Sequence, residues 1–513
     1  MLGLRKNDVV EKTSMKISIL RNPAIPPLAW CCTIQRGSED IRVECGESVE
    51  AGEDFFFEGA WAGKFAEGGF LDNTCCGTGG HLSESGLVLT PPDHILDRLF
   101  LFAETDTVTV SNSLAMLLAR TGGELISRRA DYPVLYGNIR HGLQNARTPL
   151  PLKHGRHIEA WAWYHMHIGP DLEISQKEKD RHKDLPDYTA YVSHLSDQVG
   201  QVFANACDPA RRRQYSPLGT ISSGYDSTAI SVIALDHGCT EAITFGKTRA
   251  KLGKPSEDDS GAKAAQSLGL SVTKYDRLGY RSQKGYPEIE TLGAGAEMSS
   301  ARDQISGRVF LTGYMGDTMW DREPKAQSDN IYWPVIAGHN FTELRLAADF
   351  VHFCVPFICC RQQADVIAIS QSEEMAPWRL NNDYDRPIAR RIAEERNIPR
   401  GSFGIRKRAT GVFFREEGLA ATMTPQSYDD YAHFRLIQTG VPLWRARLTD
   451  SWIKLARFAN SAFSKATVKI NKATGMQLRP PALSATPGIS SEGAVLFQWA
   501  VSHLILRYPP PDT

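Results

Sequence analysis

The sequence lacks the cysteine spacings that are typical of zinc sites and redox pairs, and neither positive nor negative charge is in excess. Its ten cysteines include no C-x-x-C pair, and several are adjacent in the chain. These spacings suit neither zinc nor a redox pair, so we expect reduced, mostly buried thiols. Lys and Arg number 58 against 59 Asp and Glu, which gives a net charge of -1. Such a balance provides no general attraction to nucleic acid or anionic membranes, so any phosphate site must be local.

The sequence also lacks a long apolar run. Its most apolar stretch, residues 493–508, is shorter than a bilayer crossing and is interrupted by Gln498, His503 and Arg507. We predict a packed helix there. Residues 1–12 lack the continuous apolar core of a secretory signal. We therefore expect a cytoplasmic protein that binds neither a membrane nor nucleic acid.

The length and the patterning predict two domains. The chain has 513 residues and 42% hydrophobic content, which is enough for two cores. Short strand-like runs separated by turn residues fill the first part, and a highly charged run at residues 176–184 resembles an interdomain linker. We place a β-rich domain at residues 1–180 and a second domain at residues 185–513. The predicted strands of the first domain are residues 55–57, 86–90, 99–103, 107–110 and 157–162.

Strands and helices alternate in the second domain. A helix is predicted at 188–206, strands at 218–221, 242–245 and 271–275, and helices at 229–237 and 259–267. This order is typical of an α/β fold with a doubly wound parallel sheet. Ligands of such folds bind beyond the carboxyl ends of the strands, so the first strand-to-helix turn is the place to look for chemistry.

That turn, residues 222–228, reads Ser-Ser-Gly-Tyr-Asp-Ser-Thr. Gly224 permits a tight turn and a close approach to phosphate, and the amides at the helix start favour an anion. The hydroxyl groups that can donate to phosphate oxygens belong to Ser222, Ser223, Ser227 and Thr228. Asp226 opposes an anion unless a cation lies between them, as Mg²⁺ does when it binds carboxylate and phosphate oxygens. A serine-rich helix cap without a ligand is the plainer interpretation.

The S-x-G-x-D-S pattern of this turn resembles the pyrophosphate loop of the N-type ATP pyrophosphatases, in their asparagine-synthetase branch. The chain departs from the family pattern at Ser223, where the motif's first glycine usually stands. The competing Walker-type loop is absent from the sequence. The resemblance implies ATP and Mg²⁺ as ligands and cleavage between the α and β phosphates. It also implies that backbone groups near Phe245 accept the adenine.

Residues 308–317 end in Leu-Thr-Gly-Tyr-Met-Gly-Asp and resemble the second magnesium element of β-lactam synthetases. By that match Gly313 belongs to the nucleotide site and Asp317 joins Asp226 in binding the metal. Tyr314 falls where those enzymes place a catalytic tyrosine, and Glu343 is the candidate for its partner glutamate. Such a pair can remove a proton from an attacking amine.

The segment 400–410 is a basic loop that resembles the family's lysine-bearing segment. Lys407 is the candidate for stabilising charge on the α-phosphate or the tetrahedral intermediate, in competition with Arg406 and Arg408. A solvated basic loop without a catalytic role is the other interpretation.

Residues 97–120 resemble the glutaminase-type (Ntn-type) domain that precedes the synthetase domain in asparagine synthetase. That family's nucleophile is an N-terminal cysteine, whereas position 2 is Leu here and Cys31 and Cys32 are internal. The first domain is therefore expected to be a glutaminase-like domain without its nucleophile. β-Lactam synthetases and lasso-peptide cyclases share this loss.

The resemblance therefore implies a ligase that adenylates a carboxylate of a small molecule or peptide and couples it to an amine. Two alternatives stay open: an ammonia-dependent asparagine synthase, and a non-catalytic paralogue that binds a nucleotide or a partner. The oligomeric state does not follow from the sequence, and a homodimer is one state that fits.

Overall fold

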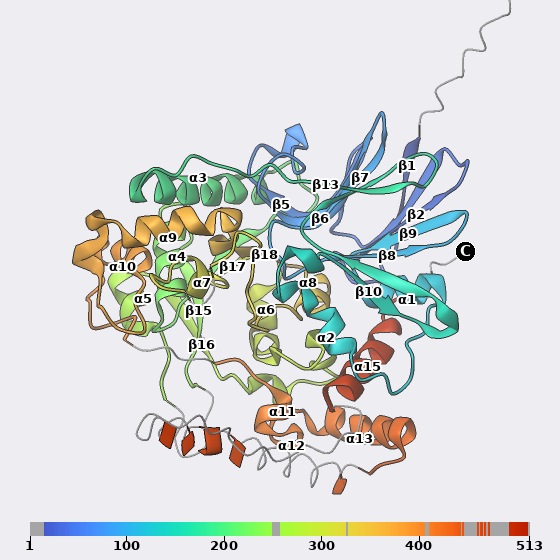
Figure 1. The fold of residues 1–513 in the computed structure, drawn as a ribbon. Coiled ribbons are helices and arrows are strands. Elements are labelled where there is room, and N and C mark those ends of the chain that lie inside the picture. The colour runs from blue at the N-terminus through green and yellow to red at the C-terminus, as the bar shows by residue number, and fades with distance from the viewer. Residues whose placement is uncertain are drawn as a thin grey trace, which may run out of the picture.

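The fold was analysed in a computed structural model. It describes the chain in ten stretches, namely residues 15–248, 257–324, 327–405, 410–442, 444–445, 459–460, 462–464, 466–467, 470–471 and 492–510. Within them the protein is an α/β structure with a β-rich N-terminal part and a parallel sheet in its C-terminal part (Figure 1).

The N-terminal part contains two sheets packed face to face. A seven-stranded sheet has the order β1-β3-β2-β9-β8-β11-β10, and a six-stranded sheet has the order β13-β12-β7-β6-β5-β4. Side chains of both sheets form one buried cluster, in which the rings of Trp30 and Phe56 lie edge to face at 5.0 Å. The strands are β1 (Lys16–Arg21), β2 (Trp30–Gln35), β3 (Asp40–Cys45), β4 (Glu50–Ala51), β5 (Phe55–Trp61), β6 (Cys75–Ser83), β7 (Gly86–Thr90), β8 (Leu99–Ala103), β9 (Thr107–Ser111), β10 (Arg147–Pro151), β11 (His157–Trp161), β12 (His165–Ile168) and β13 (Ile174–Lys177). All five predicted strands are confirmed.

The C-terminal part is built on a five-stranded, all-parallel sheet of order β16-β15-β14-β17-β18. Its strands are β14 (Ser216–Thr220), β15 (Glu241–Phe245), β16 (Ser271–Tyr275), β17 (Arg308–Thr312) and β18 (Val351–Cys354). Alternate residues of β17 point to opposite faces: Phe310 packs in one buried cluster, and Val309 and Leu311 pack in another. Helices therefore cover both faces, as predicted for a doubly wound sheet.

The helices agree with the predicted ones in place, with shifted ends. The predicted helix 188–206 is α3, whereas the helix predicted at 229–237 begins earlier, and the one predicted at 259–267 begins later. The helices are α1 (Leu114–Thr121), α2 (Tyr132–Tyr136), α3 (Tyr188–Ala206), α4 (Tyr225–Leu235), α5 (Ala262–Leu268), α6 (Arg302–Ile305), α7 (Gly316–Met319), α8 (Thr342–Ala348), α9 (Gln363–Gln371), α10 (Pro387–Glu394), α11 (Phe414–Glu417), α12 (Leu419–Thr422), α13 (Pro425–Thr439) and α15 (Glu492–Ile505).

Most of the charged run at 176–184 is exposed, but two of its charges pair with a buried carboxylate. The Lys179 ammonium lies 2.7 Å from an oxygen of Asp93 and is fully buried. Arg181 binds the other oxygen of Asp93, also at 2.7 Å, and the Lys183 amide donates to the side chain of Gln362. Because these charges are paired inside the protein, the segment is fixed to both parts of the chain.

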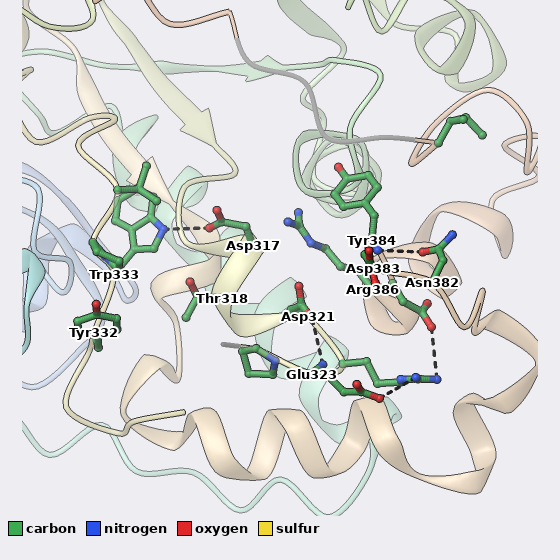
Figure 2. Close-up of a pocket in the computed structure, with 16 residues that line it drawn as sticks. Asp317, Thr318, Asp321, Glu323, Tyr332, Trp333, Asn382, Asp383, Tyr384 and Arg386 are labelled. Atoms are coloured by element: carbon green, nitrogen blue, oxygen red, sulfur yellow. Dashed lines mark hydrogen bonds and ion pairs between the residues drawn. The ribbon is translucent and has the colours of Figure 1, made fainter. Parts of the chain in front are cut away.

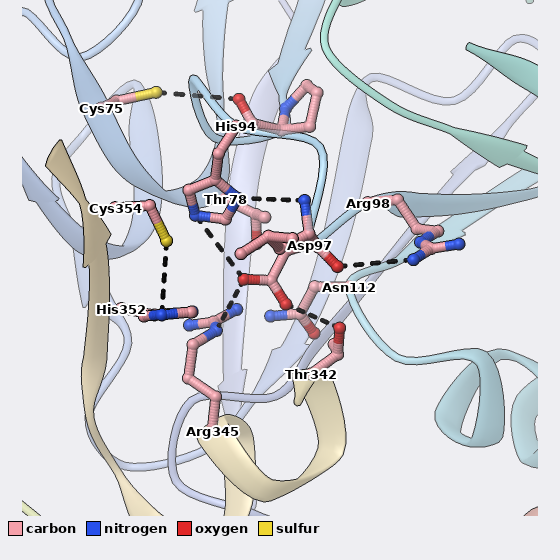
Figure 3. Close-up of polar contacts among 12 residues, drawn as sticks. Cys75, Thr78, His94, Asp97, Arg98, Asn112, Thr342, Arg345, His352 and Cys354 are labelled. Atoms are coloured by element: carbon pink, nitrogen blue, oxygen red, sulfur yellow. Dashed lines mark hydrogen bonds and ion pairs between the residues drawn. The ribbon is translucent and has the colours of Figure 1, made fainter. Parts of the chain in front are cut away.

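Buried ion pairs also join the two parts through α8 (Figure 3). Arg345 donates to both carboxylate oxygens of Glu58 on β5, and its Nε lies 3.2 Å from Asp97. The neighbouring Thr342 donates to the other oxygen of Asp97 at 2.6 Å. All three charged groups are almost completely buried. Removing one of them would leave the others as unpaired charges inside the protein.

The predicted terminal helix is confirmed as α15, which contacts α1 and α2 of the N-terminal part (Figure 1). Its residues Val495, Phe497 and Trp499 are buried in the shared core. Across the described stretches, no helix has the length and apolar character needed to span a bilayer.

Candidate active site

The candidate site lies at the carboxyl ends of β14 and β17, two neighbouring strands at the centre of the parallel sheet. The chain runs outward from β14 to β15 and β16 on one side, and β17 and β18 complete the other side. The strand order therefore reverses between β14 and β17. In doubly wound sheets this reversal opens a crevice for ligands, and both motifs singled out in the sequence meet there.

The turn after β14 is held in shape by its own hydroxyl groups. Ser222 Oγ accepts from the amide of Gly224 at 3.1 Å and lies 2.7 Å from Ser227 Oγ. Thr228 Oγ1 donates to the carbonyls of Gly224 and Ser222 at 2.8 and 3.2 Å. Gly224 is the N-cap of α4 and gives it no side-chain cap. The positive end of α4 therefore faces the pocket, which suits an anionic ligand.

Ser223 and Asp259 form a contact that the sequence did not predict. The Ser223 hydroxyl donates to the Asp259 carboxylate, and the Ser223 amide donates to the Asp259 carbonyl at 3.0 Å. Asp259 was expected in the first turn of a helix, but α5 begins only at Ala262, and Asp259 is buried in the pocket wall. Ser223 thus uses its extra hydroxyl group to fix the loop instead of leaving it against a ligand.

Asp226 packs against the turn that follows β17, where only glycine leaves room for it. A Cβ atom on Gly316 would lie 2.7 Å from the Asp226 carboxyl carbon, and one on Gly313 would lie 2.8 Å from the Asp226 Cβ. Between them Met315 adopts a left-handed backbone with φ of +73°, which is strained for a side chain of its kind. The two predicted motifs therefore fit together through a specific backbone shape.

Asp317, at the end of this turn, is oriented by a residue from another segment. Its Oδ1 accepts from Trp333 Nε1 at 2.9 Å (Figure 2). The structure brings Asp226 and Asp317 to the same pocket, as the sequence predicted. Two carboxylates beside a helix N-terminus are suitable ligands for Mg²⁺ on a polyphosphate, with phosphate and water completing the coordination. Among the described residues, no group of three or more metal-ligating side chains forms a site of its own.

Arg386, which the sequence analysis did not single out, lies between the two acids. Its Nη1 donates to both oxygens of Asp226, and Figure 2 shows its guanidinium directed towards Asp317. The planar group lies over the Tyr384 ring, 4.9 Å from the ring centroid. Burial lowers the pKa of Arg386, but Asp226, Tyr384 and Asp317 together outweigh burial and raise this pKa above its ordinary value. The arginine is therefore always charged.

Two cavities meet at these residues. The loop pocket, of about 230 Å³, is lined by the turn after β14, by Gly313 and by the end of β15. The outer cavity, of about 1070 Å³, is lined by Tyr332, Trp333, Asp321 and Asp383 among others. Asp317, Tyr384 and Arg386 line both cavities. A ligand in the loop pocket is thus adjacent to a much larger space.

The loop pocket has apolar residues in its wall. Phe245, Ile243 and Met298 line it and belong to one buried apolar cluster. Phe245 is where the resemblance expects the adenine, and the structure places this residue at the pocket wall. A flat apolar surface beside strand-end backbone groups suits a purine base.

Tyr314 lines the pocket, but its expected partner does not. Glu343 is buried, and its two oxygens accept from Ser113 at 2.6 Å and from Tyr508 at 2.8 Å. It fixes α8 to the N-terminal part, so the predicted Tyr314–Glu343 pair is wrong. Burial and the nearby Glu297 charge raise the pKa of Tyr314 well above its ordinary value.

Glu297 is therefore the acid whose charge contributes to the raised pKa of Tyr314, and the sequence did not indicate it. Its Oε2 accepts from the Val412 amide at 2.8 Å, and burial raises its pKa to about 7. A buried carboxyl group whose pKa lies near neutral pH is suited to general acid–base chemistry. Glu297 lies in a short 3-10 helix, Ala296–Ala301, and no sequence motif marked it.

Lys407 lies outside the described residues, together with Arg406 and Arg408. The residues that flank them are fixed at the pocket. The Gly404 amide donates to the Ser223 carbonyl at 2.8 Å, and Arg277 Nε donates to the Thr410 carbonyl at 2.7 Å. Thr410 itself lines the loop pocket. Lys407 therefore stays a prediction.

The N-terminal part shows no reactive thiol among its described cysteines. Burial raises the pKa of Cys31 to about 12 and that of Cys75 to about 11. These thiols stay protonated at neutral pH and are poor nucleophiles. All ten cysteines lie in described residues and are free, as predicted.

Comparison with protein-family models finds no match, and comparison with curated proteins finds no significant one. The functional argument therefore rests on the residues and geometry of this chain.

Proposed function

We propose that the protein is an ATP-dependent ligase that forms AMP and pyrophosphate while joining a carboxylate to an amine. The observation that carries the proposal is the fit of Asp226 into the glycine turn before Asp317, at the strand-order reversal of the sheet. Two sequence motifs about 90 residues apart meet there, each with a carboxylate, beside an uncapped helix N-terminus. This is the arrangement that an ATP pyrophosphatase of the asparagine-synthetase type requires.

In this proposal the loop pocket holds Mg²⁺-ATP. The α4 N-terminus and the hydroxyl groups of Ser222 and Ser227 bind the phosphates, and the surface at Phe245 binds adenine. Asp226 and Asp317 would hold Mg²⁺, which supplies positive charge to the departing pyrophosphate. The substrate carboxylate attacks the α-phosphorus, and the amine then attacks the carbonyl carbon and releases AMP.

Tyr314 and Glu297 are the proposed route for the amine proton. The raised pKa of Tyr314 keeps its phenol protonated, so the phenol donates a hydrogen bond while Glu297 accepts a proton. Lys407 is the proposed cation for the intermediate. The N-terminal part serves as a glutaminase-like scaffold without a nucleophile, which matches the protonated thiols of Cys31 and Cys75.

The outer cavity favours a substrate larger than aspartate. At about 1070 Å³ it is at the upper end of the range for small-molecule sites, and an aspartate would leave most of it empty. Ammonia-dependent asparagine synthesis therefore fits less well than coupling of a small-molecule or peptide substrate. A non-catalytic paralogue has no physical need to keep the partly exposed carboxylates of Asp226 and Asp317 around a buried Arg386, because a buried charge is costly.

The test uses the products, so it needs no knowledge of the substrate. Calorimetry should show that AMP and Mg²⁺-pyrophosphate bind at the same time, and that Asp226→Asn weakens pyrophosphate but spares AMP. Asp197→Asn, on the exposed surface of α3, is the matched control and should bind both like the parent. Mutual exclusion of the two products, or tighter binding of ADP with phosphate, would contradict cleavage between the α and β phosphates.

A further inference from the structure

Arg386 is the one Lys or Arg among the described residues that line the loop pocket, whereas three aspartates line it. A triphosphate carries several negative charges, so a pocket that is acidic on balance cannot bind it without added cations. Mg²⁺ supplies part of that charge. The remaining question is what the guanidinium does when Asp226 becomes a metal ligand.

Arg386 and a metal ion would compete for the Asp226 carboxylate. Arg386 Nη1 donates to both oxygens of the Asp226 carboxylate, which are the oxygens a metal ion would need. The arginine side chain is only 3% exposed, whereas the carboxylate is 21% exposed. A buried guanidinium that loses its carboxylate must find another acceptor, because an unpaired buried charge is strongly destabilising.

Phosphate oxygens are the acceptor that the pocket can provide. Arg386 Nε is buried and has no hydrogen-bond partner among the described residues, so the group has capacity to bind a further acceptor. Arginine binds phosphate oxygens in a forked geometry. Its side chain lies at the border of the loop pocket and the outer cavity, beside Asp317.

The backbone around Arg386 is held by hydrogen bonds on one side and by a helix on the other. The Asp385 carboxylate accepts from the amides of Leu380 and Asn381, each at 3.0 Å, which closes the preceding loop. Pro387 then starts α10, a helix that packs on α4. Arg386 is thus presented to the α4 N-terminus by a fixed turn.

We propose that Arg386 is a ligand-exchanging residue that pairs with Asp226 in the empty site and with the pyrophosphate oxygens of Mg²⁺-ATP in the filled site. This inference rests on the proposed function for the identity of the nucleotide. In this proposal the Arg386 guanidinium opposes binding of the metal ion alone and favours binding of the metal ion together with polyphosphate. The site then loads both ligands together.

The test measures two ligands without any turnover. Arg386→Gln should bind Mn²⁺ alone about tenfold more tightly, because the competing cation is gone. The same variant should bind pyrophosphate at saturating Mg²⁺ about tenfold more weakly, because a charged hydrogen-bond donor is gone. A rise in Mn²⁺ affinity together with a fall in pyrophosphate affinity in this variant would support the exchange of Arg386 between Asp226 and pyrophosphate. Arg396→Gln, an exposed arginine paired with Asp236, should leave both affinities unchanged.

Loss of both affinities together in Arg386→Gln would mean that Arg386 only maintains the shape of the site, and no change in either would mean that it has no role. Should Arg386→Gln fail to fold by thermal unfolding, Arg386→Lys decides. That variant keeps the charge but loses the fork, so it should bind Mn²⁺ like the parent and pyrophosphate about threefold more weakly. A change in its Mn²⁺ affinity, or an unchanged pyrophosphate affinity, would overturn the inference.

Failure of the proposed function has a different signature. A parent protein that binds neither Mg²⁺-ATP nor Mg²⁺-pyrophosphate would remove the ligase and the exchange together. If the parent binds both ligands but the Mn²⁺ and pyrophosphate affinities of Arg386→Gln shift in the same direction, the exchange by Arg386 is contradicted and the proposed ligase function is not.

Discussion

Replacing Gly316 by Ala tests the contact on which the site depends. The added Cβ would lie 2.7 Å from the Asp226 carboxyl carbon and 2.8 Å from its Oδ1. Because non-bonded carbon atoms normally approach to about 3.5 Å, the carboxylate must move by about 0.8 Å. Gly316 has no left-handed backbone and begins a short helix, so Ala does not strain the chain itself.

A displacement of this size should weaken Mg²⁺-ATP binding by about ten- to a hundredfold, while thermal stability changes little. Calorimetric titration with Mg²⁺-ATP measures the first, and a thermal melt measures the second. Gly401→Ala is the matched control, since a Cβ there meets nothing within 4 Å. Unchanged ATP affinity in Gly316→Ala, or an equal loss in Gly401→Ala, would refute the reasoning.

Three further predictions concern Trp333, Glu297 and Arg345. Trp333→Phe removes the hydrogen bond to Asp317 and should raise the Mg²⁺ concentration needed for ATP binding by about fivefold, as read from a metal titration. Burial raises the pKa of Glu297 from 4.5 to about 7, so the folded state keeps a proton that the unfolded chain loses, and stability should fall as pH rises between these values; melts of Glu297→Gln should lack that fall. Arg345→Met leaves Glu58 unpaired and should cost about 3–5 kcal/mol in urea unfolding, whereas an unchanged midpoint would show that the buried pair is dispensable.

Much of the fold follows from local patterns. Alternating strands and helices beyond residue 185 define the parallel sheet, and the residues after β14 and β17 mark the ends where ligands bind. The chemistry of the S-x-G-x-D-S turn indicated Asp226, whereas Asp317 was expected from the resemblance of its segment to the second magnesium element of β-lactam synthetases. Their meeting needs only the rule that such sites lie at a strand-order reversal.

The missed residues act through contacts between distant segments. Arg386 reaches Asp226 across 160 positions, and Glu297 reaches the Val412 amide across 115. No periodicity or motif in one sequence reports such pairing. Glu343 illustrates the converse, because the resemblance to β-lactam synthetases implied a catalytic acid where the fold uses a buried anchor.

The contacts of the charged run at 176–184 escaped prediction for a related reason. Composition indicated an interdomain linker, but not that a buried Asp93 is the partner of Lys179 and Arg181. Whether a charge is solvated or buried depends on the partner that the fold brings to it.

Magnesium-dependent ATP binding tests the central claim most directly. In calorimetric titrations we expect the parent protein to bind ATP only when Mg²⁺ is present. Asp226→Asn and Asp317→Asn should each weaken this binding at least about tenfold, whereas Asp197→Asn should not. ATP binding that ignores Mg²⁺ and both carboxylates, or no binding by the parent, would contradict it.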